Sequence, residues 1–262
     1  MTATARRLES QFRLLPAAIP VLLPPLPPVE SAASEAVRRL REGLEGRFAA
    51  NLTSGTELIR SLDRRKRNAV VPTTIEAVDA LLDGGLARGK MTELAGRGAR
   101  FSVVVAAIAS ATSTGEAAAL IDLGNAFDPQ LGAAAGIDLP RMLWVRPDKW
   151  KQAVAAAEML VATGFQLVVV DAGLPPLRGR VPDAAWVRLA RAAEAHGTAL
   201  LVSAPYPITG TTSEAMLRAE MSRPRWRGGL LVEVQTSLRL EKHRRKRPGE
   251  LARVAFRVPE CP

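Results

Sequence analysis

The chain has few of the residues that build disulfide frameworks and metal centres. Its 262 residues include one cysteine, Cys261, and two histidines, His196 and His243. A single cysteine excludes an internal disulfide and a cysteine-based zinc site, and two histidines exclude a histidine-rich metal centre. We therefore predict a protein without a metal site.

Aromatic residues and long apolar runs are also scarce. With 6 Phe, 4 Trp and 1 Tyr, the core must be built mainly from aliphatic side chains. No stretch has the ~18 consecutive apolar residues that a membrane-spanning helix needs. The apolar stretch 14–29 is interrupted by prolines, which exclude the helical core of a signal peptide. We expect a cytoplasmic protein with no membrane contact.

Positive charge, by contrast, is abundant. The 36 Lys and Arg residues exceed the 26 Asp and Glu residues and give a net charge of +10, and 30 of these cations are arginine. Such a charge favours an acidic partner, either nucleic acid or an acidic protein surface. The preference for arginine fits bidentate recognition of phosphate, but it fits the codon usage of a GC-rich genome equally well.

Composition divides the chain into three parts. Residues 1–30 are proline-rich and favour an extended polyproline conformation, either as a linker or as a docking ligand. Residues 31–71 combine a predicted helix at 31–47 with a linker that contains the basic run RRKR. The apolar face of this helix either docks on a partner or folds back on the core. Its candidate partner-binding residues, at helical spacing, are Val37, Leu40 and Leu44.

The third part, residues 72–262, alternates apolar strands with helices. The expected strands are 91–96, 117–122, 141–145, 165–171 and 198–204, and the expected helices are 75–82, 103–110, 150–163 and 183–196. This alternation predicts an α/β fold with a mostly parallel sheet flanked by helices. The strands 230–240 and 251–258, joined by a basic turn, predict an antiparallel hairpin at the sheet edge. The segment 205–229, which connects the core to these two strands, is predicted to be a loop.

A glycine loop follows the first strand, where a nucleotide-binding fold places its phosphate loop. That loop has the form GxxxxGK[ST], in which lysine holds the β- and γ-phosphates and the hydroxyl holds Mg²⁺. The segment here is GRGARFSV, so Gly96 and Gly98 remain. The second motif glycine, the lysine and the hydroxyl residue are replaced by Phe101, Ser102 and Val103. These replacements argue against ATP binding.

Three stretches of this part resemble the RecA recombinases. IEAVDALLDGGLARGKMTELAG is similar to the helix, glycine turn and strand that lead into the RecA phosphate loop. IDLGNAFDPQLGAAAGIDLP is similar to the segment after the second RecA core strand, and AAEMLVATGFQLVVVD to the helix and Walker B strand. The lost phosphate loop, the arginine content and the basic hairpin resemble the ImuA family, the RecA-like, SulA-related components of bacterial mutagenesis cassettes.

The resemblance implies a RecA-like core domain over residues 72–262 that has lost its catalytic set. The catalytic glutamate falls at Gly124, which cannot orient a water molecule, and the residue that senses the γ-phosphate falls near Ala204. The Walker B aspartate corresponds to Asp171, which either serves the site or only caps a loop. We expect a pseudo-ATPase without a cofactor.

The resemblance also implies partners. ImuA proteins act beside ImuB, a Y-family-like protein without polymerase activity, and a second replicative-type DNA polymerase, which together copy damaged DNA in the SOS response. This implies a non-catalytic adaptor that binds ImuB and RecA, and the polymerase indirectly. Two other hypotheses stay open: a divergent DNA-dependent ATPase of the recombinase family and a stand-alone DNA-binding protein.

Three basic segments are candidates for contact with DNA. Two correspond to the RecA DNA-binding loops, and the third is the turn of the C-terminal hairpin, which attracts phosphate without reading sequence. The candidate residues are Arg178, Arg180, Arg223, Arg225, Trp226, Arg227, Arg244, Arg245, Lys246 and Arg247. Each segment is alternatively a solvated connection, or the hairpin turn meets an acidic patch on a partner protein.

Overall fold

The computed structural model describes residues 69–175, 177 and 179–257. Four features predicted from the sequence lie outside the described residues. They are the proline-rich segment 1–30, the predicted helix with Val37, Leu40 and Leu44, the basic run RRKR, and Arg178. Within the described part, no helix is long and apolar enough to cross a membrane.

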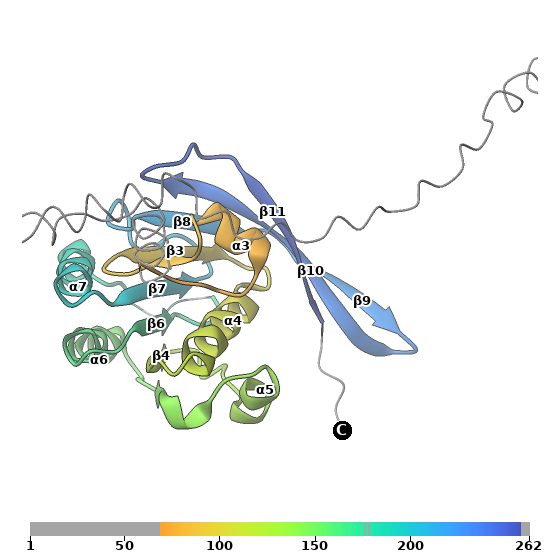
Figure 1. Cartoon of the computed structure of the whole chain (residues 1–262), viewed down its shortest axis with the longest axis horizontal. Coiled ribbons are helices and arrows are strands. Elements are labelled where there is room, and N and C mark those ends of the chain that lie inside the picture. Colours follow the sequence, from red (N-terminus) through yellow and green to blue (C-terminus); the bar gives the residue numbers. More distant parts are fainter. Residues whose placement is uncertain (1–68, 176, 178, 258–262) are drawn as a thin grey trace, which may run out of the picture. The chain divides into compact units, whose positions relative to one another are not determined.

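A nine-stranded sheet organises these residues (Figure 1). Six strands are parallel and lie in the order β8, β3, β7, β6, β4, β5. Their bounds are Ala215–Ala219, Met91–Gly96, Ala199–Ala204, Leu167–Asp171, Ala118–Asp122 and Met142–Val145. Every residue of β3, β7, β6 and β4 is buried, as a parallel sheet covered on both faces requires.

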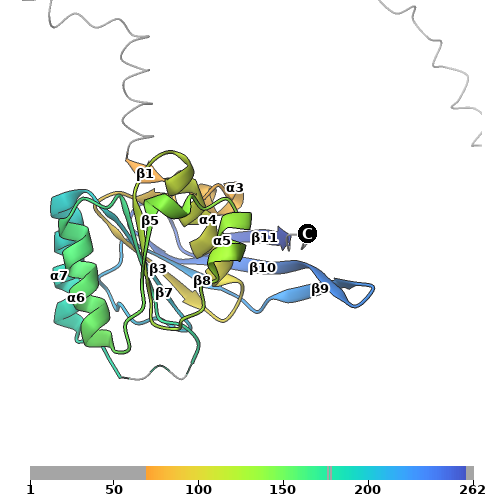
Figure 2. The same ribbon diagram turned by 90° about the horizontal axis from the view of Figure 1, so that it is seen from below.

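Helices cover both faces of the sheet (Figure 2). One face carries α4 (Arg100–Ser113), α5 (Pro129–Ala134) and α3 (Glu76–Leu81), and the other carries α6 (Trp150–Ala162) and α7 (Asp183–His196). Each face has its own apolar cluster, with Leu94 and Ile108 in the first and Trp186 and Leu189 in the second. A short helix, η3 (Leu139–Arg141), and a ribbon of β1 (Val70–Val71) and β2 (Leu86–Ala87) complete the body.

The C-terminal strands form an antiparallel extension of this sheet. The 14-residue β10 (Leu230–His243) pairs along one edge with β11 (Leu251–Arg257). Along its other edge, its C-terminal half pairs with β8 and its N-terminal half with β9 (Arg223–Arg227). We call β9, residues 230–237 of β10 and β11 the arm; β9 and the start of β10 project beyond the helices (Figures 1 and 2).

The predicted fold class is confirmed: the sheet is mostly parallel, helices flank it, and an antiparallel hairpin lies at its edge. The prediction of a loop at 205–229 is wrong, because this segment supplies β8 and β9. β8 has an alternating pattern of buried and half-buried residues and pairs in parallel with β3. A strand of five residues between polar segments gives a weak sequence signal, which explains the error.

Candidate functional site

The glycine loop after β3 packs against the chain that follows β8. Gly96 has φ +120°, and a Cβ atom there would lie 2.1 Å from the carbonyl oxygen of Ala219. A Cβ on Gly98 would lie 1.9 Å from the carbonyl oxygen of Glu220. Both glycines are therefore required by backbone packing, whether or not a phosphate is bound.

The first residue of α4 reaches across the ends of the neighbouring strands. The buried guanidinium of Arg100 donates to the carboxylate of Asp171, to Ser203 Oγ and to the carbonyl oxygen of Gly173. Asp171 Oδ1 also accepts from Ser203 Oγ at 2.6 Å, and Asp171 Oδ2 from the backbone N–H of Gly173 at 3.0 Å. We call these four residues the Arg100 network; it joins the ends of β6 and β7 to the start of α4.

The substituted loop residues occupy the first turn of the same helix. Val103 is buried, whereas Phe101 and Ser102 are half-buried, and Phe101 packs against the apolar cluster of its face. This turn contains no lysine, and its arginine, Arg100, is directed to Asp171. The motif positions of the lysine and of the Mg²⁺-binding hydroxyl are occupied by Ser102 and Val103, so neither position supplies the group that a triphosphate with Mg²⁺ requires. These residues do not fit a bound nucleotide.

The turn after β4 is held by a buried carboxylate. Asp122 accepts from the backbone N–H groups of Ala126 at 3.1 Å and Phe127 at 3.0 Å. This turn brings Gly124 against Gly173, and a Cβ on Gly124 would lie 2.5 Å from the Cα of Gly173. A glutamate at this position would displace the backbone of the turn after β6. The absence of a side chain at Gly124 and the close packing of the two turns are thus one structural feature.

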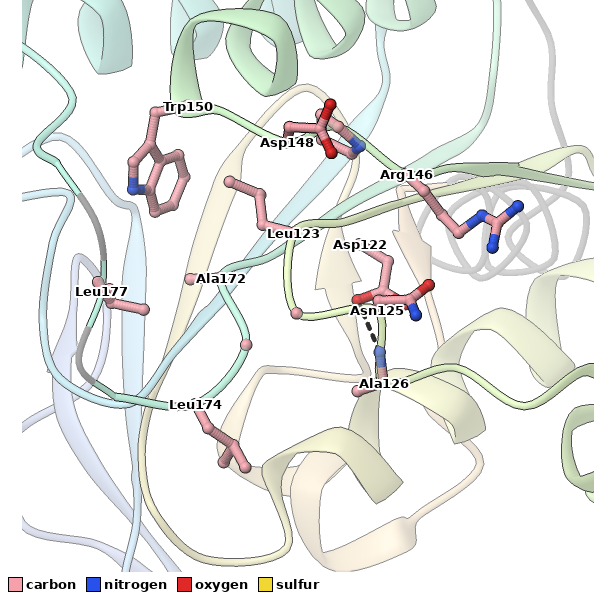
Figure 3. A pocket seen from close by; sticks show the side chains of 13 residues that line it. Asp122, Leu123, Asn125, Ala126, Arg146, Asp148, Trp150, Ala172, Leu174 and Leu177 are labelled. Atoms are coloured by element: carbon pink, nitrogen blue, oxygen red, sulfur yellow. Dashed lines mark hydrogen bonds between the residues drawn. The ribbon is translucent and has the colours of Figure 1, made fainter.

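A cavity of about 750 Å³ opens beside this turn, at the ends of β4, β5 and β6 (Figure 3). The connections from β4 and β6 lead to helices on opposite faces, the arrangement at which open α/β sheets bind ligands. The cavity's polar side chains include Asn125, Arg146 and Asp148, and Trp150 forms an apolar wall. Arg146 also stacks over the ring of Trp144, with 4.7 Å between Cζ and the ring centroid. No residue of the segment 96–103 lines it.

The DNA-binding candidates separate into groups at different places. Arg180 forms an exposed ion pair with Asp183 at 3.3 Å. The arginines 223–227 lie on β9 and the cations 244–247 in the turn after β10. Since β10 has 14 residues, its two ends are roughly 40 Å apart at the usual rise of a strand. The structure therefore does not bring these groups together into one surface.

The turn cations already have protein partners. Arg244 pairs with Glu214 at 3.2 Å, and Lys246 pairs with Asp83 at 3.2 Å and donates to a carbonyl of α3. Just before the turn, Lys242 donates to the Thr211 carbonyl oxygen at 2.7 Å, and burial, followed by repulsion from Arg244, lowers the pKa of Lys242. Arg245 and Arg247 remain exposed.

Alternation along β9 separates the side chains of its Arg-Trp-Arg sequence. Successive side chains of a strand point to opposite faces, so Trp226 lies on the face opposite to Arg225 and Arg227. The three side chains therefore do not share one face of the strand.

Sequence reasoning missed the Arg100 network. It placed the sensing residue near Ala204, and the structure supplies the polar group one residue earlier, at Ser203. Arg100 itself was visible as a cation in a loop without lysine, but its partners come from strands far along the chain. Only the parallel pairing of β6 with β7, which sets Asp171 beside Ser203, brings them together.

Comparison with known proteins is consistent with this geometry. The model of the family "RecA N-terminal domain" matches residues 51–183, about half of the chain. The chain belongs to the RecA N-terminal domain family. Among curated RecA-family relatives, Protein RecA of Clavibacter michiganensis is 39% identical over 113 residues, which cover 42% of this chain and 31% of that protein. Protein RecA of Leifsonia xyli is 37% identical over 131 residues, 47% of this chain and 37% of that protein.

The matched segment thus spans about a third of these RecA-family relatives. A crystal structure of the RadB recombinase superposes with a TM-score of 0.56 at 20% identity, over 73% of this chain and 97% of that one. At this identity the superposition establishes the RecA-like fold alone.

Proposed function

We propose that this RecA-like protein is a cytoplasmic, non-catalytic adaptor of the ImuA type, acting in a translesion-synthesis complex induced by DNA damage. The observation that carries the proposal is the Arg100 network. At the position where a RecA-type ATPase needs room for phosphate and Mg²⁺, the guanidinium of Arg100 contacts Asp171, which corresponds to the Walker B aspartate. A core with this arrangement offers partners a fixed RecA-like shape, because no nucleotide cycle changes it.

The proposed partners are RecA and ImuB, with the second DNA polymerase held through ImuB. We propose that RecA binds the apolar residues Val37, Leu40 and Leu44 and that ImuB binds the C-terminal region. A buried leucine contributes on the order of 2 kcal/mol to an interface. Loss of all three apolar side chains should therefore abolish a contact of ordinary affinity.

Capture experiments with the purified full-length chain test this role. Immobilised chain should retain purified RecA and purified ImuB, and the triple variant V37E/L40E/L44E should lose RecA while keeping ImuB. Met159→Glu is the matched control, because Met159 is 68% exposed on α6 and lies outside the proposed interface. If the intact chain retains neither protein, the adaptor proposal is wrong.

The runner-up function, a divergent DNA-dependent ATPase, is favoured only by the presence of Asp171 at the end of β6. It predicts ATP turnover that rises when single-stranded DNA is added. The adaptor proposal predicts turnover equal to the protein-free blank under both conditions.

A further inference from the structure

The cavity of about 750 Å³ at the ends of β4, β5 and β6 has no part in the proposed function. Its apolar lining includes Leu123, Ala172, Leu174 and Trp150 (Figure 3). Leu174 is 77% exposed and Leu123 is half-buried, so a ligand in the cavity can contact both side chains. Ligand pockets usually measure ~300–1,000 Å³. The volume and the lining together suit a branched or aromatic apolar group.

Arg146 supplies a cation at the rim of this cavity. Its guanidinium lies over the ring of Trp144, and among the described residues no carboxylate oxygen lies within 4.0 Å of its side-chain nitrogens. An arginine stacked on an aromatic face keeps the N–H groups at its edge free to donate. Asn125 lies on the same side of the cavity as Arg146 (Figure 3). These two side chains offer hydrogen-bond donors to one carboxylate.

Buried contacts hold the walls of the cavity in place. Trp144 Nε1 donates to Asp122 at 3.3 Å, and the Trp144 ring meets Phe127 edge-to-face, with 5.3 Å between centroids. These contacts fix the ring that carries Arg146. On the neighbouring wall, the carbonyl oxygen of Gly173 accepts from Arg100. The cavity is therefore preformed, and binding to a preformed site loses less conformational entropy.

A carboxylate on the rim limits the charge that the cavity accepts. Asp148 is exposed and lines the cavity beside Trp150 (Figure 3). The net charge of +10 on the chain attracts anions in general, but Asp148 repels a second negative charge at this place. Repulsive groups of this kind contribute to specificity. The rim therefore favours a ligand with a single carboxylate over a polyanion such as a nucleic-acid strand.

We infer that the cavity binds an apolar side chain that stands beside a carboxylate in a peptide segment of a partner protein. The apolar group fills the space between Leu123, Leu174 and Trp150. The carboxylate accepts from Arg146, whose two parallel N–H donors match its oxygens. The contact lies at the carboxyl ends of the parallel strands, where open α/β sheets bind ligands.

This inference goes beyond the adaptor proposal, which places RecA and ImuB at other parts of the chain. Capture of those two proteins tests the adaptor role, and titration of the full-length chain with small probes tests the cavity. Failure of one experiment therefore leaves the other result intact.

The test follows the ¹H–¹⁵N NMR signals of the ¹⁵N-labelled, full-length chain during titration with N-acetylphenylalanine at neutral pH, where the acid is ionised. The backbone signals of Gly124 and Gly173 and the indole signal of Trp150 should shift together. The dissociation constant should be of the order of 1 mM, as expected for a ligand of this size. The uncharged amide of the same compound should bind about tenfold more weakly, because the charge-assisted hydrogen bonds are lost.

Two exposed side chains allow variants that keep the fold. Arg146→Gln should bind the acid and the amide equally, at about the affinity of the parent for the amide. The matched control Arg191→Gln removes the same charge from an exposed position of α7 and should keep the tenfold preference. Leu174→Ala should weaken both probes by the same factor. Leu131→Ala truncates a leucine that is 57% exposed on α5 and should weaken neither.

Two peptides distinguish the source of the carboxylate. In acetyl-Gly-Ser-Gly-Phe it is the free C-terminus, and in acetyl-Gly-Asp-Phe-Gly-amide it is an internal side chain. Binding of either peptide at the cavity supports the inference, and the tighter one identifies the source. Three results would overturn it: no shift at the cavity with any probe, equal binding of acid and amide by the parent, or loss of the preference in Arg191→Gln. Binding of N-acetylphenylalanine without either peptide would also overturn it and would assign the cavity to a small carboxylic acid.

Discussion

Arginine has opposite roles in two regions of this molecule. Arg100 is buried and surrounded by protein acceptors, whereas the arginines of the arm stand on an open face with few carboxylates near them. The first region has the fold position of a phosphate site but satisfies its cation internally. In the second region the arginines are exposed, and Arg225 pairs with Glu233 on the surface. The comparison teaches that an arginine whose donors are already taken by buried protein acceptors is not available to a phosphate, whatever its position in the fold.

The largest effect is expected from opening the buried region. Arg100→Met should lower the free energy of unfolding by about 3–5 kcal/mol, because it leaves Asp171 as an uncompensated buried charge. Chemical denaturation measures this loss. Arg223→Met on the arm is the matched control and should change stability by no more than about 0.5 kcal/mol.

The double variant R100M/D171L sharpens the same comparison. Replacement of a buried ion pair by apolar residues of similar size is often neutral, so the double variant should regain most of the stability that Arg100→Met loses. If it is as unstable as the single variant, the network acts through its contacts to Ser203 and Gly173 rather than through charge pairing.

A second prediction concerns the lost catalytic position. Gly124→Glu restores the carboxylate of a RecA-like site in sequence but should produce no ATP turnover, and it should destabilise the fold by about 1–3 kcal/mol through overpacking. The measurements are a phosphate-release assay and a thermal melt. Turnover in this variant with a parent-like melt would mean that the two turns can separate to accept the side chain.

Much of the body was predictable from sequence, and the arm was not. The run LVVVD that ends at Asp171 is apolar at every position but the last, and this pattern predicts a buried parallel strand. β9, with the sequence RPRWR, is exposed at every residue and has no periodic apolar signal. Only its pairing with β10 makes it a strand, and that pairing sets which side chains face together.

The site shows the same limit. The missing lysine and hydroxyl could be read directly from Ser102 and Val103. The Arg100 network could not, because its groups meet only when β6 and β7 pair and α4 begins beside them. Sequence reasoning identified what the loop had lost, but only the structure shows what replaced it.

A smaller effect distinguishes the two faces of β9. Trp226→Ala should change the affinity for poly-dT by less than about twofold, whereas Arg223→Gln alone should weaken it by severalfold and reduce the salt slope by about 0.7. Anisotropy titration compares the two variants. A larger loss for Trp226→Ala would move the DNA contact to the opposite face and to base stacking.

The smallest effect contrasts Asp171 with a half-buried carboxylate that has no cationic partner among residues 69–175, 177 and 179–257. Asp79 accepts from the N–H and hydroxyl of Thr73, both at 2.8 Å, yet burial raises the pKa of Asp79 above its ordinary value of 3.8. The folded state therefore holds this proton more tightly than the unfolded state. Its contribution is full below pH 3.8 and is lost as pH rises through the raised pKa. The stability of the parent relative to Asp79→Asn should fall slightly over that window in denaturation experiments.

Calorimetric titration of the full-length chain with Mg-ATP tests the central claim most directly. Because Arg100 already occupies Asp171, Ser203 and the Gly173 carbonyl, the account predicts no heat above dilution, with or without single-stranded DNA. Micromolar binding that Asp171→Ala abolishes would contradict it, and would return this chain to the nucleotide-dependent members of its family.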